Sequence, residues 1–171
     1  MSDKAYYNSP VGRLVLVSED DALKAVLFDA SIDRFESVCN CRGDIPVLRD
    51  AADWLDRYFA GEAADPKELR LAPVGSSFDL EVWNLLCRIS YGKTVTYGDL
   101  AVDVAKRRGG KMSAQAIGGA VGRNPLPVII PCHRVVGAAS KLGGYSGGID
   151  KKLALLETEG INTSVFILPK K

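Results

Sequence analysis

The first sixty residues divide into short alternating segments followed by one longer stretch of helical periodicity. Three runs rich in β-branched and aromatic residues, separated by turn residues, predict the strands of a meander: residues 6–9, 13–18 and 23–28. Residues 32–41 mix apolar and polar positions without a clean period and support no prediction. Apolar side chains then recur at helical spacing from Val47 to Phe59, so we predict an amphipathic helix that ends at Gly61.

Helical spacing dominates the chain after residue 77. Four amphipathic helices are predicted, over residues 78–89, 97–105, 114–121 and 149–157. Serine or threonine residues stand where the first three helices need N-caps: Ser76 or Ser77, Thr96 and Ser113. Between the two periodic regions, residues 62–77 hold prolines, a glycine and serines with little periodicity. We therefore expect an α/β protein with two lobes, residues 1–65 and 78–171, joined by a linker over residues 66–77.

Composition narrows the classes of protein that remain. The chain has 171 residues and a formal net charge of +1, so any nucleic-acid contact must depend on a local basic patch. No apolar run approaches the length of a membrane span, and we expect neither a membrane segment nor a secretory leader. Four cysteines in a chain of this size favour reduced thiols in the cytoplasm or nucleus. One histidine and the close pair Cys39 and Cys41 supply too few ligands, so no metal is expected.

Two of the predicted helices lie close together in the sequence and are joined by a basic, glycine-containing segment. Residues 97–105 and 114–121 resemble a helix-turn-helix, and the second helix is built mainly from Ala and Gly. Small residues allow close approach to another backbone, which suits either DNA binding or tight packing inside the lobe. The segment between them, residues 106–111, is interpreted as a long loop that is either a solvated surface or a source of phosphate contacts.

The strongest chemical signal is a cysteine followed by a base and a cation. We predict that residues 128–130 and 135–136 are buried extended segments on either side of Pro131-Cys132-His133-Arg134. Because proline cannot continue a strand ladder, the chain can turn helically after Pro131 and place Cys132 at a helical N-terminus. A thiol becomes a good nucleophile only when a nearby base or cation lowers its pKa.

Residue chemistry alone leaves the role of Cys132 open. A lone cysteine in an apolar run is commonly a small core residue. Adjacent strand residues also point to opposite faces, so Cys132 and His133 could not simply touch within a strand. A reactive thiol and a buried structural one are therefore both compatible with this stretch.

The cysteine segment and its companions resemble the O6-alkylguanine-DNA alkyltransferase family. The motifs that carry the resemblance are Pro131-Cys132-His133-Arg134-Val135, Asn124-Pro125, Tyr145-Ser146-Gly147-Gly148, Ser9-Pro10-Val11-Gly12, Val95-Thr96-Tyr97-Gly98, Tyr91-Gly92 and residues 78–83. The resemblance is strong from residue 78 to residue 160 and weak between residues 32 and 45.

The resemblance implies a small N-terminal sheet-plus-helix lobe and a C-terminal winged helix-turn-helix-like lobe that carries the active-site cysteine. In this family the damaged guanine of double-stranded DNA is flipped into a pocket, since a thiolate cannot reach O6 inside the base stack. The cysteine takes the alkyl group once, because the thioether offers no group for water to displace. A monomer that needs no cofactor is the expected form.

Roles follow from the resemblance, residue by residue. Cys132 matches the nucleophile, His133 the base that acts through a water, and Glu159 the carboxylate that orients the histidine. Asn124 matches the asparagine that joins the recognition helix to the cysteine segment. Four residues match the pocket that binds guanine: Tyr97, Val135 through its carbonyl, Tyr145 and Ser146. Five match or adjoin the DNA-binding surface: Gln115, Ala116, Gly118, Gly119 and Arg123.

Two departures from the family pattern and two alternative functions remain. Gln115 stands where many members have an arginine that fills the gap left by the flipped base, and Arg123 could compensate. The segment over residues 106–111 is longer than the turn that many members have. A lesion-binding sensor of the same fold without chemistry, and a Cys-His hydrolase, are the competing functions. Arg134 is expected to pair with a helix C-terminus rather than with a phosphate.

Overall fold

The computed structural model describes residues 2–28 and 45–170. The chain divides into two compact units, one formed by residues 1–74 with residues 125–129 and the other by residues 75–124 with residues 130–171. Cys39, Cys41 and the stretch 32–41, for which the sequence supported no element, lie outside the described residues. None of the described helices has both the length and the apolar character needed to cross a bilayer.

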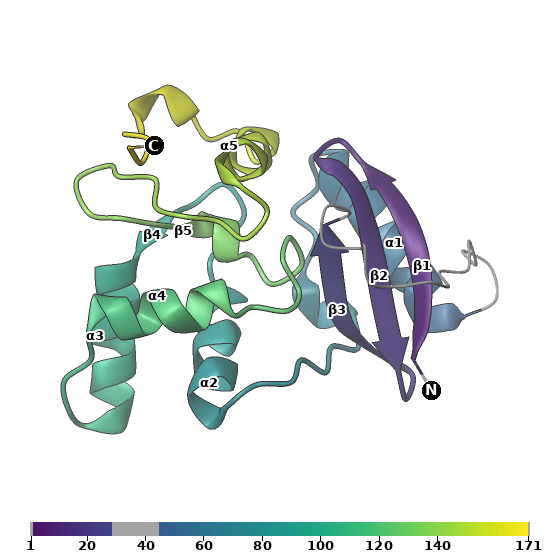
Figure 1. Cartoon of the computed structure of the whole chain (residues 1–171), viewed down its shortest axis with the longest axis horizontal. Helices are drawn as coiled ribbons and strands as arrows, with labels where there is room; N and C mark the ends of the chain where they lie inside the picture. The colour runs from purple at the N-terminus through teal and green to yellow at the C-terminus, as the bar shows by residue number, and fades with distance from the viewer. Residues whose placement is uncertain (1, 29–44, 171) are drawn as a thin grey trace. The chain divides into compact units, whose positions relative to one another are not determined.

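The N-terminal unit is built on a three-stranded antiparallel meander, as the alternating pattern predicted. Its strands are β1 (Asp3–Ser9), β2 (Gly12–Glu19) and β3 (Ala22–Phe28), in that spatial order (Figure 1). The β2–β3 turn is formed by Asp20 and Asp21, both with positive φ. That conformation matches the right-handed twist of the flanking strands, and Asp tolerates it better than most residues do.

One helix and one extended segment complete this unit. Helix α1 (Pro46–Phe59) packs against the sheet with Trp54 and Tyr58 buried on its inner face. The chain then forms a short 3-10 turn, η2 (Pro66–Glu68), and runs beside β3. The amide of Leu23 donates to the Arg70 carbonyl, and the amide of Ala72 donates to the Leu23 carbonyl. Two residues of the predicted linker, Arg70 and Ala72, are thus hydrogen-bonded to the sheet.

The C-terminal unit is mainly helical, and its elements follow the predicted order closely. They are α2 (Ser77–Leu86), β4 (Val95–Thr96), α3 (Tyr97–Arg108), α4 (Ala114–Gly122), η3 (Cys132–Arg134), β5 (Val135–Val136), α5 (Ile149–Thr158) and η4 (Thr163–Val165) (Figure 1). The predicted N-caps are confirmed, since the side chains of Ser76, Thr96 and Ser113 each accept a backbone N–H from the first turn of their helix. The predicted α/β fold with a small sheet unit and a helical C-terminal unit is confirmed.

Two predicted elements are wrong. Lys106, Arg107 and Arg108 were placed in a loop, but they form the last turn of α3, which Gly109 ends in the left-handed conformation. Long basic side chains favour a helix and interact well with the negative end of its dipole, so the helix continues to the glycine. Residues 128–130 were placed in a strand, but they are buried in an irregular turn that begins with a positive φ at Val128.

Helix α4 is held against its neighbours by side chains from α2. The indole N–H of Trp83 donates to the Ala120 carbonyl at 2.9 Å. The guanidinium of Arg123, at the end of α4, donates twice to the buried carboxylate of Asp79, at 2.7 and 3.0 Å. Together α3, the connection over residues 109–113 and α4 form the predicted helix-turn-helix, with α4 anchored at its C-terminal half.

Candidate active site

Cys132 begins a single 3-10 turn directly after Pro131. The turn spans Cys132–Arg134 and leads at once into the short strand β5. The Cys132 amide donates to the Ile130 carbonyl at 2.7 Å, and the Arg134 amide to the Pro131 carbonyl at 3.1 Å. Pro131 therefore diverts the chain into a helical turn, as predicted, but the turn is only three residues long and contributes little dipole.

The thiol of Cys132 is buried, and burial raises its pKa. Four influences act in the opposite direction: hydrogen bonding from Asn124, the charge of Lys152, the backbone N–H of Cys132 and hydrogen bonding from Tyr145. His133 and Arg134, which the sequence offered as the activating base and cation, are not among them. The resting group is therefore a thiol that must lose its proton before it can attack.

Asn124 connects the end of α4 to the cysteine turn. Its side-chain amide donates to the Ile130 carbonyl at 2.8 Å, immediately before Pro131, and the residue is buried. The same side chain interacts with the Cys132 thiol. Asn124 thus lies between the helix and the sulfur, at the position that the sequence indicated.

His133 and Glu159 form a fully buried pair. The ring Nε2 lies 2.6 Å from Glu159 Oε1, and neither side chain is exposed. Burial lowers the pKa of His133, so the imidazole is neutral near pH 7. With the Nε2 proton donated to the carboxylate, the basic lone pair is on Nδ1.

Arg134 is the partner that keeps Glu159 ionised. Its guanidinium donates to both carboxylate oxygens at 2.9 to 3.1 Å, and the Gly92 amide donates to Oε2 at 2.9 Å. Burial alone would raise the pKa of Glu159, but hydrogen bonds from His133 and Arg134, together with the charge of Arg134, lower it to about 2. Arg134 also donates to the Ile89 carbonyl, just beyond α2, at 2.5 Å. Its structural role near a helix C-terminus is therefore confirmed.

Lys152 is a buried residue of the site that the sequence pattern did not single out. It is not exposed at all, and its ammonium donates to the carbonyls of Val135, Leu142 and Gly144, at 2.7, 2.6 and 3.2 Å. Burial lowers the pKa of Lys152 to about 8, and interaction with Cys132 opposes that shift. A signal was present, because Lys152 lies three residues before Leu155, on the apolar face of α5.

A hollow of about 280 Å³ opens onto the thiol. It is lined by Tyr97, Gly118, Val121, Gly122, Cys132, Gly144, Tyr145 and Ser146. Three predicted pocket residues, Tyr97, Tyr145 and Ser146, are therefore brought together with Cys132. Burial and the neighbouring Cys132 raise the pKa of Tyr97, which keeps its phenol protonated as a hydrogen-bond donor.

Gly118, which was predicted at the DNA-binding surface, lines this hollow, whereas the other predicted residues lie outside it. Val135 is buried, and its carbonyl accepts from Lys152. Gln115 and Gly119 are exposed on α4, and Ala116 is half-buried. Arg123 is engaged by Asp79, whose pKa the guanidinium lowers, and so is anchored to α2 rather than projecting from α4.

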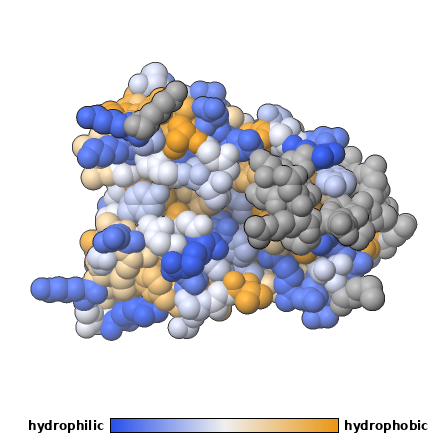
Figure 2. Space-filling view, viewed as in Figure 1, coloured by the Kyte–Doolittle hydropathy of each residue, from blue (hydrophilic) through white to orange (hydrophobic). Residues whose placement is uncertain are grey.

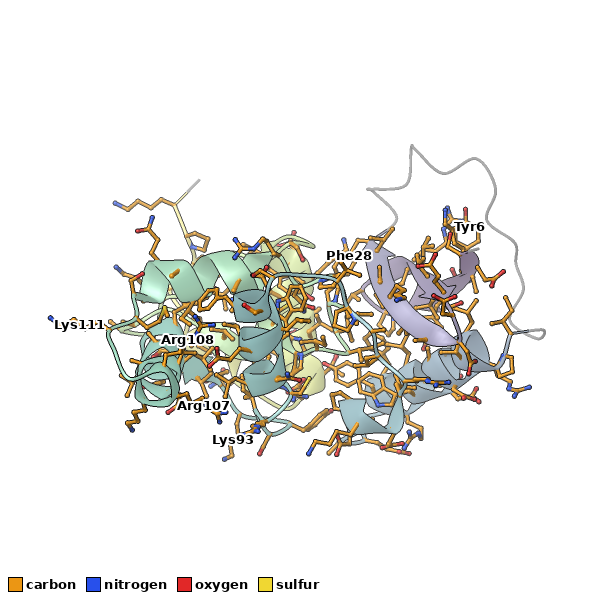
Figure 3. The ribbon with its side chains drawn as sticks, turned by 90° about the horizontal axis from the view of Figure 1, so that it is seen from below. Tyr6, Phe28, Lys93, Arg107, Arg108 and Lys111 are labelled. Carbon is orange, nitrogen blue, oxygen red and sulfur yellow. The ribbon has the colours of Figure 1, made fainter. Side chains whose placement is uncertain are left out.

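Basic side chains gather where α3 ends. Figure 3 shows Arg107, Arg108 and Lys111 around this end of the unit, and Figure 2 shows long hydrophilic side chains projecting there. Arg108 is held by Glu81 at 2.8 Å and lies over the Phe78 ring. Within the described ranges, no three His, Cys, Asp or Glu side chains are grouped to hold a metal ion.

Comparison with known proteins places these features in a family. Residues 77–161 match the 6-O-methylguanine DNA methyltransferase DNA-binding domain, and residues 4–73 match the ribonuclease-like domain of the same methyltransferase. A methylated-DNA–protein-cysteine methyltransferase of Methanosarcina acetivorans is 40% identical over 91% of this chain and 97% of its own. The protein of that name from Haemophilus influenzae is 36% identical over 91% of this chain and 85% of its own.

A solved structure agrees with these sequence matches. The crystal structure of Mycobacterium tuberculosis OGT in complex with DNA has a TM-score of 0.74 and 36% sequence identity to this chain, covering 96% of this chain and 94% of that one. The similarity therefore extends over both structural units of this chain. The chain belongs to the 6-O-methylguanine DNA methyltransferase family.

Proposed function

We propose that this protein repairs DNA by transferring an alkyl group from O6 of guanine to the sulfur of Cys132, once per molecule. The observation that carries the proposal is the hollow, where a thiol, two phenols and a hydroxyl meet at a site sized for a small ligand. The names of its relatives, methylated-DNA–protein-cysteine methyltransferase, support the same chemistry.

The reaction begins with loss of the Cys132 proton. Neutral His133, oriented by Glu159, takes this proton at Nδ1 through a water molecule. The sulfur then attacks the alkyl carbon, a carbon–sulfur bond forms and the carbon–O6 bond breaks. The electron pair of that bond passes into the guanine ring system, which regains one proton overall. Tyr97 is the donor placed to assist the departing base.

The product explains why the protein acts once. A thioether at Cys132 has no leaving group that water can displace, and the sulfur is buried. A second turnover would require cleavage of this unactivated carbon–sulfur bond. The reaction therefore consumes the protein in proportion to the lesions repaired.

Recognition requires the damaged base to leave the duplex. The thiol lies inside the hollow, so the guanine must be flipped to reach it. We assign Tyr145 and Ser146, which line the hollow, to holding the base, and α4, with Gln115, Ala116, Gly118 and Gly119, to the DNA groove. Asn124 links the two functions because it contacts both the cysteine turn and the thiol. An unoxidised thiol also requires a reducing compartment, which fits an intracellular protein.

Intact-mass measurement after incubation with O6-benzylguanine tests this proposal. The expected result is a gain of one benzyl group per protein molecule, with guanine released in equal amount. No mass gain would instead support a lesion sensor without chemistry, and repeated turnover without mass gain would support a hydrolase. Either of these two outcomes would overturn the proposal.

A further inference from the structure

We propose that Lys152 is the counter-ion of the Cys132 thiolate and the cation that makes this buried sulfur reactive. The sequence places His133 and Arg134 next to the cysteine, but the structure directs both of them to Glu159. The ammonium of Lys152, on α5, is held by the carbonyl of Val135, which directly follows the cysteine turn, and by that of Gly144, which lines the same hollow as Cys132. Its use in alkyl transfer rests on the proposed function, whereas its effect on the thiol can be measured separately.

The setting of Lys152 is unusual for a lysine. Its three ammonium protons are donated to three backbone carbonyls, and no part of the residue is exposed. Carbonyl dipoles satisfy the hydrogen bonds but do not cancel the charge. Among the residues that the structure describes, no carboxylate forms an ion pair with Lys152. An uncompensated buried charge is costly, so a negative partner is expected nearby.

A count of the charges around the sulfur identifies that partner. Arg134 and Glu159 form a matched pair, and buried His133 is neutral before reaction. The phenol of Tyr97, which lines the hollow, carries no charge near pH 7, because burial and Cys132 raise its pKa. Lys152 is thus left with one unmatched positive charge. Ionisation of Cys132 supplies a negative charge that matches the charge of Lys152, while His133 carries the proton that leaves the sulfur.

The carbonyls that hold Lys152 also fix where its charge lies. Val135 directly follows the turn that begins with Cys132, and Gly144 lines the hollow on the side of Tyr145 and Ser146. One ammonium therefore joins the cysteine segment to the segment that contributes Gly144, Tyr145 and Ser146 to the pocket. A neutral side chain of the same length would lose both the charge and this connection.

The chemical step remains balanced with these groups alone. The thiol proton passes to His133, the electron pair remains on sulfur, and Lys152 keeps its own proton throughout. The thiolate–ammonium pair then persists until the sulfur attacks. Lys152 is a positioning residue in this scheme, because it acts on the nucleophile and forms no bond to the alkyl group.

Lys152→Met removes the charge while keeping an unbranched apolar chain, and Lys151→Met is its matched control on the same helix, at a half-buried position. We would measure the rate of iodoacetamide addition to Cys132 between pH 6 and pH 10 by peptide mapping. The expected result is a rate about tenfold lower at pH 7 in Lys152→Met, with the pH midpoint displaced upward, and no change in Lys151→Met. Equal pH profiles in a folded Lys152→Met protein would overturn the proposal.

A reciprocal measurement covers the case in which Lys152→Met does not fold. The Lys152 ammonium would be titrated by NMR in the wild-type protein and in Cys132→Ser, which keeps the three carbonyl contacts but cannot form a thiolate. Because coupling between two sites is mutual, the pKa of Lys152 should fall in Cys132→Ser. An unchanged Lys152 titration would contradict the proposal.

These measurements distinguish a failure of this inference from a failure of the proposed function. If benzylguanine leaves the wild-type mass unchanged while the iodoacetamide and NMR results are as expected, the proposed function is wrong and the Lys152–Cys132 ion pair is supported. If benzyl transfer occurs and both ionisation tests show no coupling between Lys152 and Cys132, the proposed function is supported and the proposed role of Lys152 is wrong.

Discussion

The interior of the C-terminal unit holds four ionisable side chains close to Cys132, whereas helix α4 carries none on its exposed face. The interior set consists of His133, Arg134, Lys152 and Glu159, each at most 5% exposed. Helix α4 consists of Ala, Gly, Gln, Ile and Val alone, and the cation that follows it, Arg123, is bound to Asp79.

This difference indicates that the buried residues serve the chemical step and that the exposed face of α4 serves DNA recognition. The interior side chains lie buried beside the cysteine turn whether or not DNA is present, so changes there should affect the free base and the duplex alike. The surface of α4 affects only the reaction in which a base must leave a duplex. Substitutions of the buried residues should also have larger effects than substitutions on α4, because an unpaired charge costs much more free energy in a buried site than in water.

The largest effect on rate is expected for His133→Ala. Loss of the base should slow transfer from both benzylguanine and duplex DNA by about 10²- to 10⁴-fold. Glu159→Gln should slow transfer less, because an amide can still orient the imidazole. Single-turnover rates from pH 6 to pH 9 provide the measurement. Wild-type rates for His133→Ala at every pH would show that the histidine is not the base.

The largest effect on stability is expected for Glu159→Gln, which leaves Arg134 buried without its carboxylate. The cost should be about 3–5 kcal/mol in urea unfolding near pH 7. Since the pKa of Glu159 is lowered to about 2 from 4.5, its stabilising contribution is complete above about pH 4.5 and is lost as the pH falls toward 2. The wild-type protein should therefore lose stability more steeply than Glu159→Gln over that range. Parallel curves would contradict the ion pair.

A smaller effect, confined to duplex DNA, is expected for Gln115→Arg. Extruding a guanine leaves an unstacked gap at a cost of a few kcal/mol, which a planar cation fills better than a neutral amide. Repair of O6-methylguanine in duplex should become faster, while the rate with free benzylguanine stays unchanged.

Arg123→Ala is the comparison for that variant. Because Arg123 is anchored to Asp79, its loss should lower stability by about 1–3 kcal/mol and leave duplex selectivity unaltered. If Gln115→Arg has no effect while Arg123→Ala selectively impairs duplex repair, then Arg123 fills the gap.

The smallest effect is expected at the basic end of α3. Replacing Lys106, Arg107 or Lys111 by Gln should reduce the slope of log affinity against log salt by about 0.9 for each phosphate that the variant no longer neutralises. Exposed Lys67 of the N-terminal unit is the matched control, and Lys67→Gln should leave the slope unchanged. Equal slopes for all four variants would show that this end of α3 makes no contact with DNA.

Local signals in the sequence were sufficient where one side chain decides one element. Ser76, Thr96 and Ser113 begin their helices because each hydroxyl satisfies a backbone N–H that the helix leaves open. The strand predicted over residues 128–130 failed because an apolar run shows burial but not backbone shape. There, the Ile130 carbonyl accepts from Asn124 and from the Cys132 amide, contacts that no local pattern reveals.

Apart from Lys152, the residues of the site could be named from the sequence, but the contacts between them could not. Cys132, Tyr97, Tyr145 and Ser146 meet at the hollow, yet sequence adjacency suggested Arg134 as the activating cation. Arg134 instead binds Glu159, and the cation that we propose for the sulfur is Lys152, which lies on α5, further along the chain. Which cation lies near the sulfur depends on packing across elements, and lysines on amphipathic helices are ordinarily exposed.

Peptide mapping after reaction with duplex DNA that contains one O6-methylguanine tests the central claim most directly. The protein should gain one methyl group per molecule, located on Cys132, and Cys132→Ala should gain none while still binding the duplex. Cys87→Ala, Cys39→Ala and Cys41→Ala should keep full stoichiometry. A methyl group found on Cys39, Cys41 or Cys87, or full transfer by Cys132→Ala, would contradict the account.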